Sequence, residues 1–279
     1  MPTAVLIPLD RSANAQAALA VGATFARWWN IPTGLITVVV PNTDTAEAAE
    51  YLRAVAANAG LPAPNVEVVV STAPAEAILR AARERDAIIC MATHSRGRLG
   101  ELMLGSLSQA IVARSPDPIV LVGPSAQPGA RAEPSIGHPL CGPILVPLDG
   151  SSTAEYALAA AAPWARQFGV SVHLVQAVPD DATSVSPSEP VALIEQAAPW
   201  TDPADLTVTA EVLGGQPARV ITSAAQNRNS PLIVLTSRGA TAEKNRTLSA
   251  VARQIVRTAS MPVLVVPHHS AAASLPSGG

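Results

Sequence analysis

The chain has 279 residues, of which 48% are hydrophobic, 14% charged and 3% aromatic, and its formal net charge is -3. The length is typical of two domains, and the apolar content excludes a wholly disordered chain. The small acidic charge and the scarce aromatic residues disfavour nucleic acid and anionic membrane surfaces as partners. No apolar run reaches the ~18 residues that a membrane span needs, so we expect no membrane partner.

Strands alternate with helices through the first half. Ser12 is the candidate N-cap of the first helix, and Pro74 can open the third helix because its missing N–H is not needed there. The continuous Val, Ile and Leu character of the strands is typical of a parallel sheet covered by helices on both faces. The predicted strands span 4–9, 34–40, 66–70, 86–92 and 118–123, and the predicted helices span 12–29, about 43–58, a segment from 74 onward and 106–115.

The second half repeats the first. Residues 5–12, Val-Leu-Ile-Pro-Leu-Asp-Arg-Ser, recur at 144–151 as Ile-Leu-Val-Pro-Leu-Asp-Gly-Ser, and the ending at 118–122 recurs at 262–266. The second half has a few extra residues within 180–203, whose Asp, Ser and Pro content indicates a longer surface loop. The pattern predicts an α/β fold of two repeated doubly wound domains, each a five-stranded parallel sheet flanked by helices.

The repeat also predicts the domain organisation. Domain one spans 1–125 and domain two spans 143–268, with a Pro-, Gly- and Ala-rich linker at 126–142 and a flexible tail at 269–279. The N-terminal residues lead directly into an apolar strand without the features of a signal peptide, so we expect a cytoplasmic protein.

The two cysteines do not form a disulfide framework. Cys90 lies in an apolar run and is expected to be a buried thiol, whereas no motif around Cys141 indicates redox or metal chemistry.

In an open α/β sheet, ligands bind beyond the carboxyl ends of the strands. Asp10 follows the first strand, where it can accept a hydrogen bond from a ribose hydroxyl or a base amine, or act as a helix N-cap or turn residue. Val38 and Val39, at the end of the second strand, can face a base ring or pack in the core. The sequence leaves both alternatives open at each place.

The segment 91–106 runs from the fourth strand into a helix start. Ser106 and the following amides form a helix N-terminus that suits a phosphate, and Gly105 allows the backbone to approach it closely. Arg96 can add positive charge there or be an ordinary solvated loop residue. His94 has no nucleophile or orienting partner nearby in the sequence, which favours a positional role.

Signatures of several enzyme classes are absent from the sequence. It contains no P-loop, dinucleotide-binding or nucleophile-elbow motif, and no cluster with zinc spacing. The lack of a catalytic lysine and of paired carboxylates disfavours an ATPase or nucleotidyl-transfer enzyme. We therefore expect no catalytic residues, and at most a weak, incidental ATPase activity.

Together these features resemble the universal stress protein (UspA-like) family in its tandem form. The resemblance rests on Val-Leu-Ile-Pro-Leu-Asp near the start, Ala-Thr-His-Ser-Arg-Gly after the fourth strand, Leu-Gly-Ser-Leu at the helix start and Ser-Pro-Asp-Pro-Ile-Val-Leu-Val at the end of the first half. It implies an adenine nucleotide alpha hydrolase-like fold, and a division between members that bind ATP and members that do not. It also implies that the fifth strands, 118–123 and 262–267, pair and make one chain a pseudo-dimer, with homodimerisation of chains as a further expectation.

The resemblance implies that ATP-binding members carry G-x2-G-x9-G-[ST] after the fourth strand. In the first repeat these positions hold Ala92, Ser95, Gly105 and Ser106. In the second repeat they hold Thr236, Gly239, Ser249 and Ala250. The final Gly-Ser is intact only in the first repeat, and Ala177 replaces the valine of the second strand in the other. Repeat one is therefore the expected ATP site, with repeat two as a weaker site or structural partner.

The resemblance also implies roles for residues of repeat one. Asp10 and Val39 would hold the adenosine end, while Gly105, Ser106 and Leu107 would offer amides and a hydroxyl to the phosphates. Mg²⁺ would accompany the nucleotide, although no dedicated carboxylate cage is visible in the sequence. The expected nucleotide-binding residues are Pro8, Leu9, Asp10, Val39, Met91, Ala92, Ser95, Arg96, Gly105, Ser106 and Leu107.

The implied function is that of a stress-response regulator, in which ATP occupancy changes the surface presented to an unknown protein partner. The alternative is a universal stress protein that binds no nucleotide and acts as an interaction module. Ala92, Ser95 and the degenerate second repeat favour this alternative.

Overall fold

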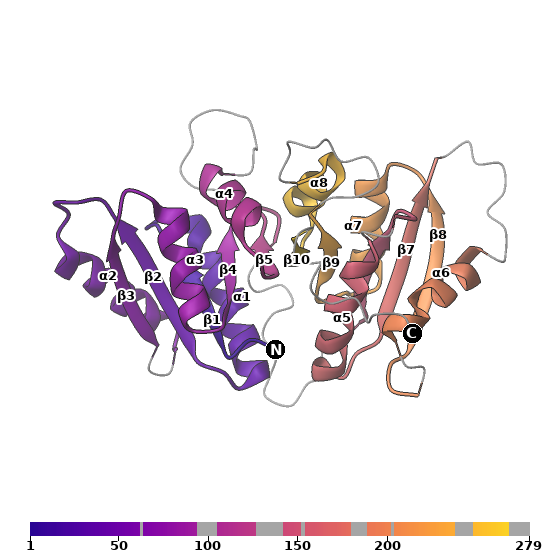
Figure 1. The fold of residues 1–279 in the computed structure, drawn as a ribbon, viewed down its shortest axis with the longest axis horizontal. Coiled ribbons are helices and arrows are strands. Elements are labelled where there is room, and N and C mark those ends of the chain that lie inside the picture. The colour runs from indigo at the N-terminus through magenta and orange to yellow at the C-terminus, as the bar shows by residue number, and fades with distance from the viewer. Residues whose placement is uncertain are drawn as a thin grey trace.

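The computed structural model describes residues 1–61, 64–93, 105–126, 142–151, 154–179, 189–201, 204–237 and 248–267. Within these ranges, strands and helices alternate in both halves (Figure 1). The first half contains β1 (Ala4–Pro8), α1 (Ala13–Trp29), β2 (Thr33–Val39), α2 (Thr45–Asn58), β3 (Asn65–Val70), α3 (Pro74–Glu84), β4 (Ala87–Ala92), α4 (Ser106–Arg114) and β5 (Ile119–Val122). The second half contains β6 (Ile144–Leu148), α5 (Glu155–Phe168), β7 (Val172–Val178), α6 (Glu189–Ala197), β8 (Val208–Gly214), α7 (Pro217–Asn227), β9 (Ile233–Thr236), α8 (Ala250–Thr258) and β10 (Val263–Val266).

The local signals in the sequence produce the predicted element starts. Ser12 caps α1, because its hydroxyl accepts a hydrogen bond from the Ala15 N–H at 3.3 Å. Pro74 begins α3, as predicted. The predicted buried thiol is also confirmed: Cys90 is fully buried, and desolvation raises its pKa.

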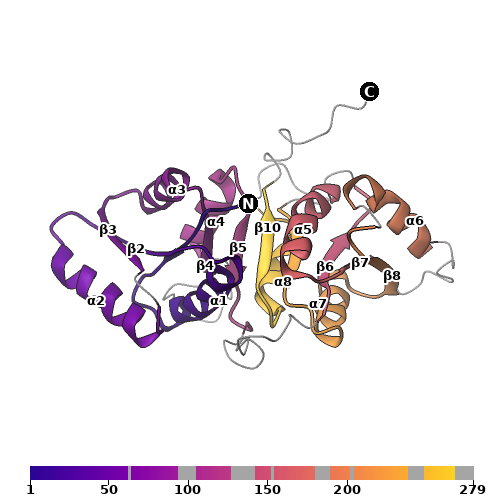
Figure 2. The ribbon, with the colours of Figure 1, turned by 90° about the horizontal axis from the view of Figure 1, so that it is seen from below.

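The strands form one ten-stranded sheet in the order β3-β2-β1-β4-β5-β10-β9-β6-β7-β8. Strand pairs within each half are parallel, and the two halves join through the antiparallel pairing of β5 with β10. Figure 2 shows these two strands side by side at the centre of the molecule. The expected pairing of the fifth strands, and with it the intrachain pseudo-dimer, is confirmed.

Helices cover both faces of this sheet. One core layer contains buried side chains of α1, α2, α5 and α6, and the other contains buried side chains of α3, α4, α7 and α8. The strand residues at the centre of the sheet, such as Val120 and Leu264, are completely buried. None of the described helices is both long and apolar enough to cross a membrane.

An aromatic cluster joins the two halves on one face of the sheet. It contains both phenylalanines of the chain and three of its four tryptophans. Phe25, Trp28 and Trp29 of α1 pack against Trp164 and Phe168 of α5, and the Trp29 and Trp164 rings are 4.4 Å apart in an edge-to-face arrangement. The scarce aromatic residues are thus concentrated where their large apolar area holds the repeats together.

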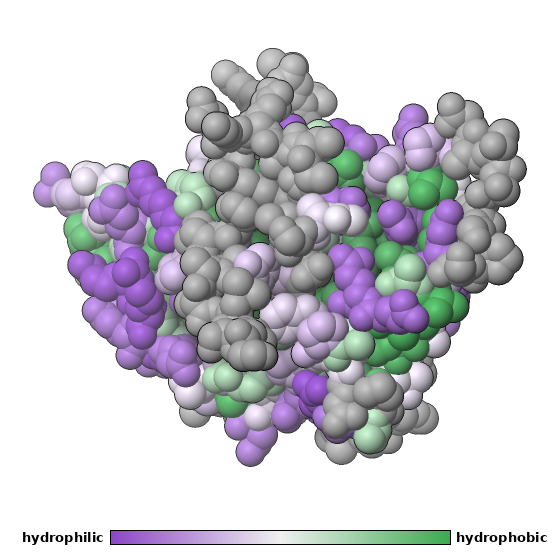
Figure 3. Space-filling view, turned by 45° about the vertical axis from the view of Figure 1, so that its right-hand side comes forward, coloured by the Kyte–Doolittle hydropathy of each residue, from purple (hydrophilic) through white to green (hydrophobic). Residues whose placement is uncertain are grey.

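The prediction of a surface loop at 180–203 is wrong for residues 189–200. This region contains α6 and a 3-10 turn over Ala198–Trp200, and α6 buries Leu193 and Ala197 against the sheet. The Asp, Ser and Pro content of the region concealed a short amphipathic helix. Val191 and Ile194 of this helix remain exposed, and Figure 3 shows hydrophobic areas separated by hydrophilic ones on this side of the molecule. Residues 180–188, 202–203, most of the predicted linker and the predicted tail lie outside the described residues.

Each repeat has an ion pair between its third strand and the end of the following helix. Arg85 pairs with Glu67 at 2.6 Å in repeat one, and Arg228 pairs with Glu211 at the corresponding place in repeat two. Repeat two adds the buried side chain of His173, whose Nε2 lies 3.0 Å from Glu211 Oε1 and whose Nδ1 lies 2.7 Å from the Thr209 hydroxyl.

Two residues of this cluster, His173 and Glu211, have pKa values that are shifted from their usual values. Burial lowers the pKa of His173 below its usual 6.5, in spite of the neighbouring Glu211 carboxylate. Burial acts to raise the pKa of Glu211, but the hydrogen bond from Arg228 and the contact with His173 outweigh it, so this pKa is lowered below 4.5.

The joint between the repeats should depend on Gly123. A Cβ atom there would lie 1.8 Å from the backbone oxygen of Val256 in α8, so Gly123→Ala forces β5 and α8 apart. We expect a loss of roughly 1–3 kcal/mol in the free energy of unfolding, measured by urea denaturation with tryptophan fluorescence. Gly34→Ala is the control, because the atom nearest to its Cβ would be the tip of the Leu6 side chain at 3.3 Å, and the nearest backbone oxygen would lie at an ordinary contact distance of 3.8 Å. Equal losses in both variants would contradict this role of the joint.

Stability should decrease on mild acidification because of His173. The unfolded chain takes up a proton on this imidazole near pH 6.5, whereas the folded chain holds it neutral to lower pH. The free energy of unfolding should therefore be fully retained above this value and fall as the pH drops toward the folded-state pKa. Urea denaturation across this range, compared with His173→Gln, measures the effect. An equally steep decline in the variant would show that another group is responsible. Protonation of Glu211 affects the free energy of unfolding only at more acidic pH, because its pKa is lowered below 4.5.

Candidate functional site

A pocket in repeat one opens at the carboxyl ends of β1 and β4, next to the start of α4. The chain leaves β1 toward β2 on one side, while β4 lies on the other side of β1, so this is a topological switch point of the sheet. The lining residues are Pro8, Leu9, Asp10, Ser12, Ala15, Ile36, Val38, Pro74, Ile78, Met91, Ala92, Gly105, Leu107 and Ser108.

Most of the predicted binding residues meet in this pocket. The structure brings together Pro8, Leu9, Asp10, Met91, Ala92, Gly105 and Leu107. Val38 lines the pocket and Val39 does not, because successive strand residues face opposite sides of the sheet. Ser106 is exposed at the first position of α4, beside the lining, and Ser95 and Arg96 lie outside the described residues.

The turn after β1 shapes one wall of the pocket. Asp10 acts as a turn residue, because its Oδ1 accepts the Ser12 N–H at 3.0 Å, and its exposed carboxylate also borders the pocket. Arg11 follows with φ of 64°, a left-handed conformation for which repeat two uses Gly150. Such a conformation costs about 1 kcal/mol or more in a residue other than glycine. Arg11 is held there by an ion pair with Glu47 at 2.9 Å and by its position over the Tyr51 ring.

The opposite wall is the N-terminus of α4. Gly105 precedes the helix and donates its N–H to the Thr93 carbonyl at 2.8 Å, and the Ser108 hydroxyl donates to the Ala92 carbonyl. Among the described residues no side chain caps this helix, whose N-cap residue is a glycine. The amides of its first turn therefore retain donor capacity for an anion, supported by the positive end of the helix dipole.

Repeat two differs at the same position. Ser249 occupies the place of Gly105, and its hydroxyl accepts the Ala252 N–H at 3.1 Å, so α8 is capped by its own side chain. Asp149 still forms the turn after β6 with the Ser151 N–H, and Thr236 ends β9. Gly239 lies outside the described residues.

The repeat-one pocket is small. Its volume is about 80 Å³, compared with about 300–1,000 Å³ for typical small-molecule sites. A nucleotide therefore requires a wider form of this site than the one seen here. Among the described residues, no group of three or more His, Cys, Asp or Glu side chains could hold a metal ion.

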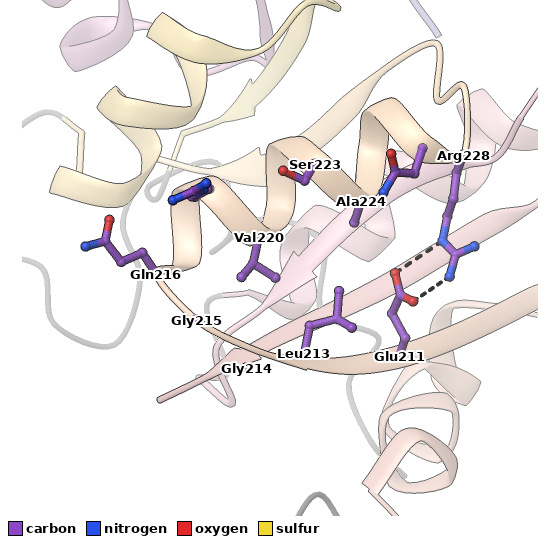
Figure 4. Close-up of a pocket in the computed structure, with 11 residues that line it drawn as sticks. Glu211, Leu213, Gly214, Gly215, Gln216, Val220, Ser223, Ala224 and Arg228 are labelled. Atoms are coloured by element: carbon purple, nitrogen blue, oxygen red, sulfur yellow. Dashed lines mark hydrogen bonds and ion pairs between the residues drawn. The ribbon is translucent and has the colours of Figure 1, made fainter. Parts of the chain in front are cut away.

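A second pocket, of about 710 Å³, lies in repeat two between β8 and α7 (Figure 4). It is lined by Glu211, Leu213, Gly214, Gly215, Gln216, Arg219, Val220, Ser223, Ala224, Asn227 and Arg228. Sequence reasoning missed it, because no motif marks these residues. A residue-by-residue comparison of α3 with α7 could have found it, because the acidic residues Glu76 and Glu84 correspond to Arg219 and Asn227.

Comparison with known proteins shows which family both halves of the chain resemble. The model of the universal stress protein family matches residues 1–123 and again 142–267. The universal stress protein Rv2005c of Mycobacterium tuberculosis is 26% identical over 293 residues, with 94% of this chain and 96% of the relative covered. The universal stress protein Rv2623 of the same species is 25% identical over 300 residues, with 94% and 95% covered.

A solved structure shows the same architecture. The crystal structure of a universal stress protein from Archaeoglobus fulgidus DSM 4304 superposes with a TM-score of 0.69 at 20% identity, covering 96% of this chain and 99% of that one. The two family-model matches together span most of the sequence. The chain therefore belongs to the universal stress protein family and contains two of its domains in tandem.

Proposed function

We propose that this tandem universal stress protein binds ATP in repeat one and uses nucleotide occupancy to regulate its interaction with a protein partner. The observation that carries the proposal is the difference between the two corresponding helices. The start of α4 has a glycine as its N-cap, no cap from any described side chain, and a position beside the pocket at the switch point, whereas the start of α8 is capped by the Ser249 hydroxyl. Free amides at a helix start suit a phosphate.

The pocket residues suit the parts of ATP. The amides at Ser106 and Leu107 would bind the phosphates, and the Ser106 hydroxyl adds a donor. The N–H of Gly105 bonds the Thr93 carbonyl, so this glycine would contribute close approach of the backbone instead. The Asp10 carboxylate would accept a ribose hydroxyl, and the apolar side chains of Val38 and Met91 would contact the base. Mg²⁺ would bind mainly through the phosphates, because these residues supply no carboxylate cage. Ser95 belongs to the proposed site through the family motif alone, and Arg96 belongs to it through the charge that the sequence places after the fourth strand.

A regulatory role requires that ATP bind two states of the protein differently. The volume of about 80 Å³ supports this requirement, because ATP would select a wider state of repeat one. The surface that changes would lie at the start of α4, where the Gly105 N–H bonds the Thr93 carbonyl.

A second candidate function is an interaction module without nucleotide. The same small pocket favours it, as does Ala92 at a glycine position of the family motif. The two candidates differ in whether the purified protein binds ATP.

Calorimetric titration of ATP into nucleotide-stripped protein tests the proposal, with Gly105→Asp as the variant. Gly105 has φ of -57° and ψ of 149°, which any residue can adopt, and aspartate is a good N-cap, so this variant should fold. Its carboxylate would occupy the helix amides and repel the phosphates. We expect one ATP to bind per chain in the wild type, and we expect Gly105→Asp to weaken the affinity for ATP by about tenfold or more.

Ser249→Asp is the matched control, because it places the same charge at the corresponding position of repeat two. Binding should be unchanged in this variant. Two ATP molecules per chain, with one lost in each variant, would show that repeat two also binds. The absence of any saturable binding to folded wild-type protein would favour the interaction module.

A further inference from the structure

The pocket between β8 and α7 lies in the repeat that lacks the Gly-Ser signature, at the outer edge of the ten-stranded sheet. Its volume of about 710 Å³ falls within the range of about 300–1,000 Å³ that small-molecule sites occupy. Figure 4 shows it as an elongated groove along α7. It belongs to neither the nucleotide pocket nor the joint between the repeats.

The groove has an apolar middle and polar ends. Leu213 of β8 and Val220 of α7 point toward one another in its centre (Figure 4). Gln216 and Arg219 lie at the start of α7, and Asn227 lies at its end. A ligand along this groove would therefore contact apolar atoms in the middle and hydrogen-bonding groups at both ends.

The charges in the groove leave one cation unpaired. Arg228 is neutralised by Glu211 through two hydrogen bonds, the dashed contacts in Figure 4. Arg219 is exposed and forms no ion pair with any described residue. Among the described residues, the groove thus has one positive charge without an ion-pair partner, beside the uncharged donors of Gln216 and Asn227.

The corresponding face of α3 in repeat one has different side chains. The positions of Arg219, Ser223 and Asn227 in α7 correspond to Glu76, Arg80 and Glu84 in α3. All three side chains in α3 are engaged in ion pairs: Glu76 with Arg114 at 3.0 Å, and Arg80 with Glu84 at 4.0 Å.

The structural ion pair of the fold is kept in both repeats, as Arg85 with Glu67 and Arg228 with Glu211. The face in repeat one thus has two carboxylates and one arginine, whereas the face in repeat two has one arginine and no carboxylate. Val70 at the end of β3 also corresponds to Gly214, which lines the repeat-two groove without a side chain to fill it.

We propose that this groove binds a small organic anion. Its acidic group, a carboxylate or a phosphate, pairs with Arg219, and its apolar part lies on Leu213 and Val220. Gln216 and Asn227 donate hydrogen bonds to its remaining polar atoms. Guanidinium groups bind both kinds of acid through paired N–H donors, so the chemistry of the site accepts either.

Titration of ¹⁵N-labelled protein with phenyl phosphate and, separately, with benzoate tests the proposal by NMR. Both probes combine an acidic group with an apolar ring, and together they separate the phosphate from the carboxylate. We expect saturable shifts of α7 and β8 resonances with at least one probe. Arg219→Glu, which installs the residue type of Glu76, should weaken binding about tenfold or more while the protein stays folded.

Arg53→Glu is the control for net charge, because Arg53 is exposed on α2 and forms no ion pair with any described residue. Its binding should equal that of the wild type. The absence of saturable shifts with both probes, or equal affinity in Arg219→Glu, would overturn the proposal. So would loss of binding in Gly105→Asp, which would assign the probes to the nucleotide pocket. The result is independent of whether ATP binds in repeat one.

Discussion

The antiparallel pairing of β5 with β10 is the contact on which the rest of the molecule depends. Each repeat ends in a short apolar strand that would expose unpaired backbone groups and apolar side chains if the repeat stood alone. Pairing the two strands buries both completely and makes one sheet from two. The aromatic cluster of α1 and α5 covers one face of this joint, and the close approach of Gly123 to Val256 adds a contact that leaves no room for a side chain.

The paired strands of this joint line neither of the two pockets, so the pocket residues of the two repeats can differ without weakening the joint. The same helix start is uncapped at Gly105 and capped at Ser249. The same helix face bears a paired Glu76 in α3 and an unpaired Arg219 in α7 among the described residues. The ion pair between the third strand and the third helix persists in both halves, which indicates a structural role. Differences at fixed positions of a shared fold thus indicate where function, rather than folding, distinguishes the repeats.

The features that could be predicted from the sequence are those that depend on local residue patterns. Continuous apolar runs and helix caps located the strands and helices of the first repeat, and the Gly-Ser pair located the uncapped helix start. The sequence could not predict α6, because Asp, Ser and Pro are typical of loops and its few buried residues form a weak periodic signal. It also did not separate Val38 from Val39, because the facing of a strand residue depends on register within the sheet. The groove along α7 needs β8 and α7 side by side, which no local pattern shows.

The same contacts indicate which part of repeat one can adapt to a ligand. At its C-terminal end α4 is tied to β5 by a short turn, in which the Ser115 hydroxyl bonds the backbone of Asp117, and β5 is held between β4 and β10. At its N-terminal end, the hydrogen bonds between described residues include those from the Gly105 N–H to the Thr93 carbonyl and from the Ser108 hydroxyl to the Ala92 carbonyl. We therefore expect a wider pocket to arise by movement at the start of α4 rather than at the joint. A nucleotide signal would then be expressed on the surface beside this helix start, while the two repeats keep their relative position.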